Sequence, residues 1–202
     1  MLKVLSAAAT ALALIATSPA AAATLVIDGS GHLTGATGVN VGGTLYDVTF
    51  QDGTCGSVFG ACDAANFAFN SSGAADLAAQ ALLDQVFVDG PLGQFDSNPA
   101  LTVTCLSLTA CQFAIPYAVQ SSFVYFSAPV NYSAAGDQVN SSTFQVDLNL
   151  ITDPNTSFAK FTLSAVPSVP EPATWAMMLL GFGGIGLTMS HKKAGQKLRA
   201  VA

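Results

Sequence analysis

Regular alternation of apolar and polar residues in the second half of the chain predicts β-strands. Residues 144–150 carry Phe, Val, Leu and Leu at every second position with polar residues between them, the pattern of a half-buried strand. Residues 159–165 alternate in the same way. The segment 153–156 between them reads Asp-Pro-Asn-Thr, which is typical of a turn. We therefore expect these two strands to form a C-terminal hairpin.

Shorter apolar runs predict further strands earlier in the chain. They cover residues 25–27, 45–50, 101–108, 112–119 and 123–126. Gly-containing turns follow the first two runs, and a Gly-rich stretch, 35–43, leads into the second. The runs 101–108 and 112–119 are close enough in sequence to be expected as a hairpin.

One segment has the spacing of an amphipathic helix. Ser71 or Ser72 can cap its start, Asp76 lies in its first turn, and Gly90-Pro91 is expected to end it. Apolar residues fall on one face, which favours packing against a sheet over a groove for a partner; they are Ala75, Ala79, Leu82, Leu83 and Val86. The body is therefore expected to be mainly β, a sandwich-like arrangement with one packed α-helix.

The N-terminus has the order of parts of a secretory signal peptide. Lys3 gives a positive start, an apolar run follows, and Pro19 interrupts it before four small alanines. We expect a signal helix within residues 1–23 and cleavage by signal peptidase after Ala23, with Ala22 as the next choice. An ordinary buried N-terminal helix is the alternative, and the small-residue end argues against it.

The C-terminus, residues 167–202, also has three parts in order. Pro170-Glu171-Pro172 comes first, and 173–189 is a run of 17 uncharged residues that would span about 25 Å as a helix, slightly less than a bilayer core. The end, 190–202, is basic, and its Lys192, Lys193, Lys197 and Arg199 are expected to stop transfer and stay on the cytoplasmic side. These features predict a transmembrane helix that tethers an exported body, residues 24–166.

Residues 169–187 resemble the PEP-CTERM sorting domain of proteins exported by Gram-negative bacteria. The resemblance rests on Pro170, Glu171 and Pro172 and on the Trp-Ala-Met-Met and Gly-Phe-Gly-Gly runs that follow. It implies recognition and cleavage by an exosortase at Pro-Glu-Pro, and a location at the cell surface or in an exopolysaccharide matrix after an inner-membrane stage. The family usually ends in an arginine cluster, whereas this chain has His191-Lys192-Lys193.

The glycines of this tail match a nucleotide-binding spacing by coincidence. A dinucleotide site needs a preceding strand and an acidic residue about 20 positions later, and no acidic residue follows Glu171. The glycines instead suit close helix packing within a membrane; they are Gly181, Gly183, Gly184 and Gly186.

Charge is unevenly divided between the body and the ends. Residues 24–169 contain eleven aspartates, no glutamate and one basic residue other than His32, Lys160, for a formal charge of −10. Such a body repels phosphate backbones, so nucleic acid is excluded as a partner. It suits a solvated extracellular domain or one that attracts cations.

The four cysteines form two close pairs in the sequence. Three pairings are possible, and local bridges Cys55–Cys62 and Cys105–Cys111 are the simplest in an oxidising compartment. A zinc site is the alternative, but the separations are wider than in zinc knuckles.

Candidate catalytic residues are few, and no catalytic set is expected. His32 is the body's only histidine, and no G-x-S-x-G motif supplies a nucleophile for it. We therefore expect a non-enzymatic surface or matrix protein without a resident cofactor. The alternatives are a polysaccharide- or calcium-binding module, with calcium in acidic loops around Asp28, Asp47, Asp52 or Asp63, and a hydrolase using two aspartates.

Overall fold

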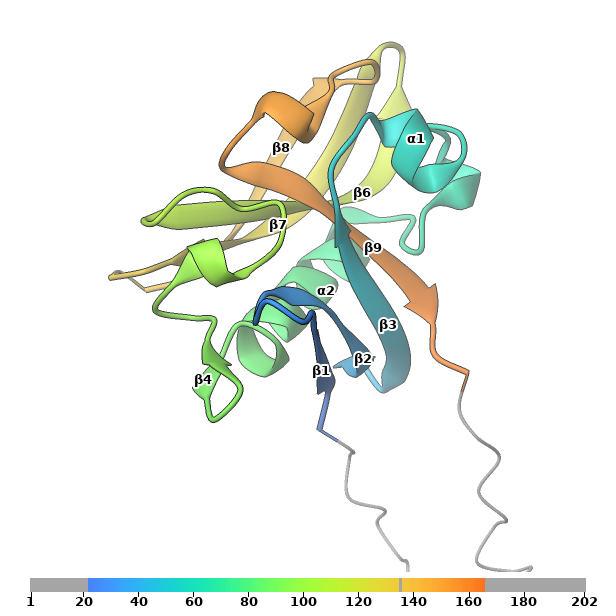
Figure 1. Cartoon of the computed structure of the whole chain (residues 1–202). Helices are drawn as coiled ribbons and strands as arrows, with labels where there is room; N and C mark the ends of the chain where they lie inside the picture. The colour runs from blue at the N-terminus through green and yellow to red at the C-terminus, as the bar shows by residue number, and fades with distance from the viewer. Residues whose placement is uncertain (1–21, 135, 166–202) are drawn as a thin grey trace, which may run out of the picture. The chain divides into compact units, whose positions relative to one another are not determined.

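The computed structural model describes residues 22–134 and 136–165, which form a mainly β body with one long packed helix, as predicted (Figure 1). The signal helix within 1–23 lies almost wholly outside the described residues, and the transmembrane helix expected over 173–189 lies entirely outside them. Within the described ranges, no helix combines the length and the apolar character needed to cross a membrane.

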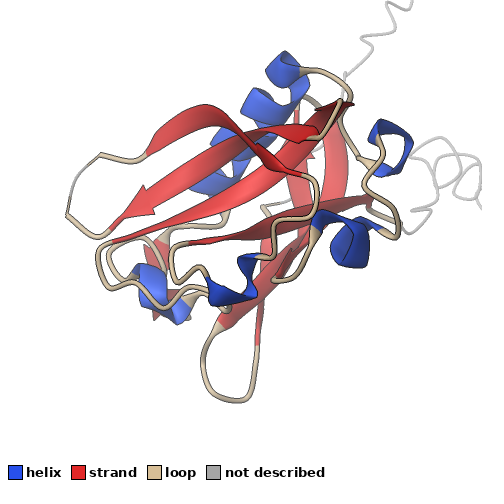
Figure 2. Ribbon diagram, turned by 90° about the horizontal axis from the view of Figure 1, so that it is seen from above, coloured by secondary structure: helices blue, strands red, loops and turns tan. Residues whose placement is uncertain are grey.

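Seven strands form a single sheet in the order β1-β2-β3-β9-β6-β7-β8. Their bounds are β1 Thr24–Ile27, β2 Leu33–Val41, β3 Thr44–Gln51, β6 Ala110–Gln120, β7 Phe123–Tyr132, β8 Gln138–Gln145 and β9 Thr156–Leu163. Neighbours are antiparallel except β6 and β9, which run parallel. The expectation of a sandwich is thus corrected: these seven strands form one continuous sheet, because β9 pairs with β3 and with β6. Figure 2 shows the strands together with the helices around them.

The remaining elements are short apart from one helix. They are α1 Cys55–Phe59, η1 Ala64–Asn66, α2 Ser72–Gln85, η2 Pro99–Leu101, η3 Leu150–Thr152 and a small hairpin of β4 Asp89–Gly90 with β5 Gly93–Gln94.

The predictions of two hairpins, 101–108 with 112–119 and 144–150 with 159–165, are both wrong. The segment 102–109 contains no strand, and a hydrogen bond from the Leu106 N–H to the Pro154 carbonyl (2.9 Å) holds it beside the loop before β9. The segment 146–149 leaves the sheet after β8, and the Leu150 N–H donates to the Gly53 carbonyl (2.9 Å). The alternation of residues 144–150 therefore reflects a turn with Leu150 anchored in the core.

Helix α2 covers one face of the sheet and begins at the expected cap. The Ser71 hydroxyl accepts a hydrogen bond from the Ala74 N–H, and the predicted apolar stripe is buried. The helix ends at Gln85, five residues before the expected stop, because Phe87 turns into the core. There the Phe87 ring stacks with those of Phe50 and Phe113 at centroid distances of 5.5 and 4.8 Å.

The opposite face of the sheet has its own apolar cluster, closed by α1 and η3. Phe158 of β9 lies at its centre and is fully buried, with Phe59 and Phe144 edge-on to it at 5.5 Å each. Lys160, also on β9, donates from its Nζ to the Val58 carbonyl in α1 (2.8 Å). Because both faces are covered, successive residues of the inner strands are buried.

Candidate functional site

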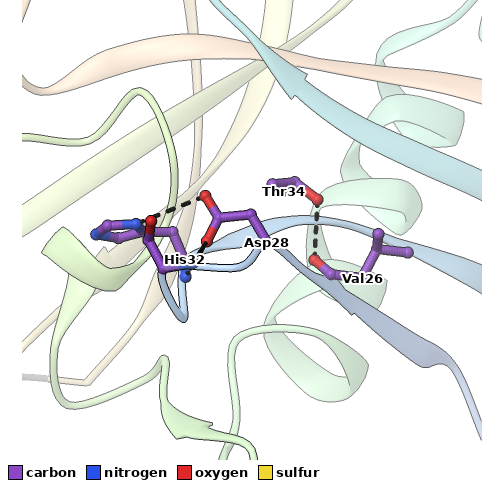
Figure 3. A network of polar contacts seen from close by, with 5 residues as sticks. Val26, Asp28, His32 and Thr34 are labelled. Atoms are coloured by element: carbon purple, nitrogen blue, oxygen red, sulfur yellow. Dashed lines mark hydrogen bonds and ion pairs between the residues drawn. The ribbon is translucent and has the colours of Figure 1, made fainter.

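His32 lies in the turn between β1 and β2 and is paired with Asp28 (Figure 3). Its Nδ1 is 3.7 Å from the Asp28 carboxylate, whose other oxygen accepts the N–H groups of Ser30 (2.8 Å) and His32 (2.9 Å). The hydrogen bond from the His32 backbone is the main reason that the pKa of Asp28 is lowered. Both side chains are well exposed, so this constellation stabilises a surface turn.

Most body aspartates are used as hydrogen-bond acceptors within the fold. Six of the eleven accept backbone N–H groups: Asp28, Asp47, Asp63, Asp89, Asp137 and Asp153. A carboxylate that accepts backbone N–H groups fixes the local turn or cap in which it lies. These acidic side chains are therefore explained by local structure.

The acidic loops proposed for calcium serve separate turns. Asp47 accepts the Gly38 N–H (3.0 Å), and Asp63 caps η1 through the Ala65 N–H (3.0 Å). Across residues 22–134 and 136–165, no three His, Cys, Asp or Glu side chains are grouped as a metal site would require. Asp28, Asp47, Asp52 and Asp63 are thus not brought together.

Two aspartates, Asp52 and Asp137, have raised pKa values, which the sequence did not indicate. Burial, followed by the negative charge of Asp153, raises the pKa of Asp52 to about 6. The Oδ1 atom of Asp52 is buried and has no hydrogen-bond partner. Burial also raises the pKa of Asp137, against the hydrogen bond from the Tyr132 N–H, and Asp96 adds to the rise.

Replacing Asp52 with Asn is expected to stabilise the fold at pH 7.5. The pKa of Asp52 in the folded state lies above the ordinary 3.8, so the folded chain holds the Asp52 proton more tightly than the unfolded chain does. The fold of the wild type therefore loses stability as the pH rises from about 4 through 6, where Asp52 becomes charged. The shift corresponds to about 3 kcal/mol before screening, and we expect about 1 kcal/mol for this partly solvated group. Urea unfolding of both proteins between pH 4 and 8 measures it.

Asp147→Asn is the matched control, since it removes the same charge from an exposed residue. We expect it to change the unfolding free energy by less than about 0.5 kcal/mol. The quantity compared is the difference in unfolding free energy between Asp52→Asn and the wild type. If that difference were no larger at pH 7.5 than at pH 4, the burial of this charge would be contradicted.

The cysteines form the two local disulfides expected. Cys55–Cys62 ties α1 to the segment before η1, with Cα atoms 5.2 Å apart. Cys105–Cys111 ties the loop after η2 to the start of β6, with Cα atoms 6.0 Å apart. No free cysteine remains in the described part of the chain.

A shallow, mostly apolar pocket of about 630 Å³ lies where β1 begins. Its walls come from the first described residues, the end of α2 and the β4–β5 hairpin, with Asp84 and Asp89 among them. Both aspartates accept hydrogen bonds within the fold: Asp84 accepts the side-chain N–H of Gln80 (2.9 Å), and Asp89 accepts the N–H groups of Asp96 (3.0 Å) and Ser97 (3.1 Å).

The strongest functional signal lies in the tail that follows the body. The described residues end at Ala165, so Pro170, Glu171, Pro172, the four glycines and the basic residues lie outside them. A family described as the PEP-CTERM protein-sorting motif matches residues 168–193. The chain therefore carries this sorting motif, which indicates an exported protein that is sorted by an exosortase. No curated protein and no solved structure matches the chain.

Proposed function

We propose that this protein is a non-enzymatic component of the cell surface or extracellular matrix, cleaved by an exosortase at Pro170-Glu171-Pro172. The match of residues 168–193 to the sorting motif is the observation that carries the proposal. In this scheme, signal peptidase removes residues 1–23, segment 173–189 tethers the chain to the inner membrane, and cleavage then frees the body.

The body's chemistry supports a structural role. Its two disulfides suit the oxidising conditions met after export. Its histidine and most of its carboxylates hold turns and caps, as described above. A negatively charged, disulfide-closed domain is well suited to remain soluble among polysaccharides.

Mass spectrometry of the exported protein tests the processing step. In a host with an active exosortase, we expect the wild-type chain to lose the segment after the Pro-Glu-Pro motif. A chain with Pro170→Ala, Glu171→Ala and Pro172→Ala is expected to keep it and to remain in the membrane fraction. Ser168→Ala is the control and should be processed like the wild type. An intact wild-type C-terminus in that host would overturn the proposal.

Incubation with isolated exopolysaccharide tests the non-enzymatic part. We expect the size distribution of the polysaccharide to stay unchanged after incubation with the mature protein. A shift to shorter chains that the heat-denatured protein does not cause would show hydrolysis and contradict this part.

A further inference from the structure

β8 forms an unprotected edge of the sheet. Within the described ranges its eight residues pair only with β7, in a continuous register from Gln138↔Val130 to Gln145↔Phe123. Natural edge strands are usually shielded by charges, prolines, bulges or short length. The sequence Gln-Val-Asn-Ser-Ser-Thr-Phe-Gln has no charge and no proline, and its pairing has no bulge. The other edge strand, β1, has only four residues and a register shift at Val26/Ile27.

A groove runs between this edge and helix α2. It has a volume of about 500 Å³ and is lined by Gly73, Asp76, Leu77, Gln80, Val139 and Ser141. Leu77 is 60% exposed there, although it lies in the middle of a well-packed helix. When a strand is added to an open sheet edge, main-chain hydrogen bonds give affinity and pockets beside the edge take alternate side chains of the added strand.

Hydrogen bonds fix α2 to this edge. The Asp76 carboxylate on α2 accepts the hydroxyl of Ser127 on β7, and the hydroxyl of Ser141 on β8 lies 3.3 Å from that of Ser127. Ser127 is fully buried, so this link is shielded from water. These hydrogen bonds therefore fix the position of α2 relative to β7 and β8, the elements that form the groove.

Charge indicates which partner the edge fits. The body carries a formal charge of −10, so two copies repel each other over most of their surfaces. β8 is a neutral strip in this surface, and its exposed Asn, Ser and Thr side chains can pair with the same residues of a second strand. An antiparallel pairing of β8 with itself is isologous and closes after two copies.

We propose that two copies of this chain pair through their β8 strands and form one continuous sheet. Opposed residues in an antiparallel pair share a face of the sheet. The twofold axis therefore passes between a residue near the strand centre, Ser141 or Ser142, and the same residue of the second copy. The added strand then lies along the groove and covers Leu77. The proposal does not depend on the sorting route.

Sedimentation velocity of the exported chain, with a Lys introduced on β8, tests the dimer. We expect the wild type to dimerise, and more strongly as the salt concentration rises, because salt screens the repulsion between two anionic bodies. Ser142→Lys brings two positive charges together near the axis and should raise the dimer Kd at least about tenfold, the effect of about 1.4 kcal/mol. Thr37→Lys, an exposed residue of the inner strand β2, adds the same charge and should leave the Kd within about twofold.

Disulfide trapping gives an independent measurement. Ser141→Cys and Ser142→Cys are tested separately, and the one at the axis, which opposes its own copy, should form a cross-linked dimer under mild oxidation. Thr37→Cys should not cross-link. A wild type that stays monomeric at high salt, or a Ser142→Lys protein that dimerises like the wild type, would overturn the proposal. Failure of both β8 cysteine variants to cross-link, or cross-linking of Thr37→Cys to the same extent, would do the same.

Discussion

Replacing Phe113 with Ala is expected to remove a large part of the stability of the body. The side chain is fully buried, and its ring lies 4.7 Å from that of Phe50 and 4.8 Å from that of Phe87. These three rings join β6, β3 and the end of α2, so truncation leaves a cavity that neither the sheet nor the helix can close. A loss of about 3–5 kcal/mol follows from core truncations of this kind, against a total of about 5–15 kcal/mol for a small domain.

Urea unfolding followed by far-ultraviolet circular dichroism, with the disulfides intact, measures this loss. Phe123→Ala is the control at the start of β7, where the side chain is 44% exposed. Its cost should stay below about 1 kcal/mol. A cost for Phe113→Ala as small as that of the control would show that the three rings do not form the centre of the core.

Replacing Gly35 with Ala is expected to distort the pairing of β2 with β3. A Cβ atom at Gly35 would lie 2.1 Å from the Val48 carbonyl oxygen. The obstacle is backbone in the middle of the sheet, so it can move only if the two strands separate. We expect a loss of about 3 kcal/mol and faster amide hydrogen exchange along β2 and β3.

Gly29→Ala is the matched control for this substitution. Gly29 lies in the β1–β2 turn, and a Cβ atom there would meet nothing within 4 Å. Thermal unfolding should place this variant within about 0.5 kcal/mol of the wild type. If Gly35→Ala were equally harmless, the close approach of β2 to β3 would be wrong.

Gly35 also shows why one strand could not be predicted. The sequence predicts only a Gly-rich lead into a strand over 35–43, because glycine lowers strand propensity. In the structure it belongs to β2, where Gly35 permits the close approach of β3 and Gly38 takes a positive φ of 71° at a register shift. These glycines are explained by tertiary contacts, which a local pattern does not contain.

Other elements could be predicted because their signals are local. The Ser71 cap and the apolar stripe of α2 lie within one segment, and each cysteine pair closes a short loop. The parallel pairing of β6 with β9 joins residues more than 40 positions apart, and no turn motif in the sequence indicates it. The two expected hairpins failed for this reason, since nearby strands were assumed to pair.

The sorting motif and the groove beside β8 also differ in whether their residues are contiguous in sequence. The sorting motif is contiguous in sequence, so its residues could be named and the match to 168–193 agrees with them. The groove beside β8 combines Leu77 with Val139, which are far apart in sequence and have no motif in common. The raised pKa of Asp52 was not foreseeable either, because it depends on burial and on Asp153.

The bond between Lys160 and the Val58 carbonyl affects how the body survives outside the cell. Residues 24–169 contain no arginine and only this lysine, so trypsin-like proteases have one peptide bond to attack. That bond lies in β9, where Lys160 and Phe161 pair with β3, and the lysine side chain is held against α1 (2.8 Å). A protease needs its substrate extended and free, so the folded body resists this class of enzyme along its whole length.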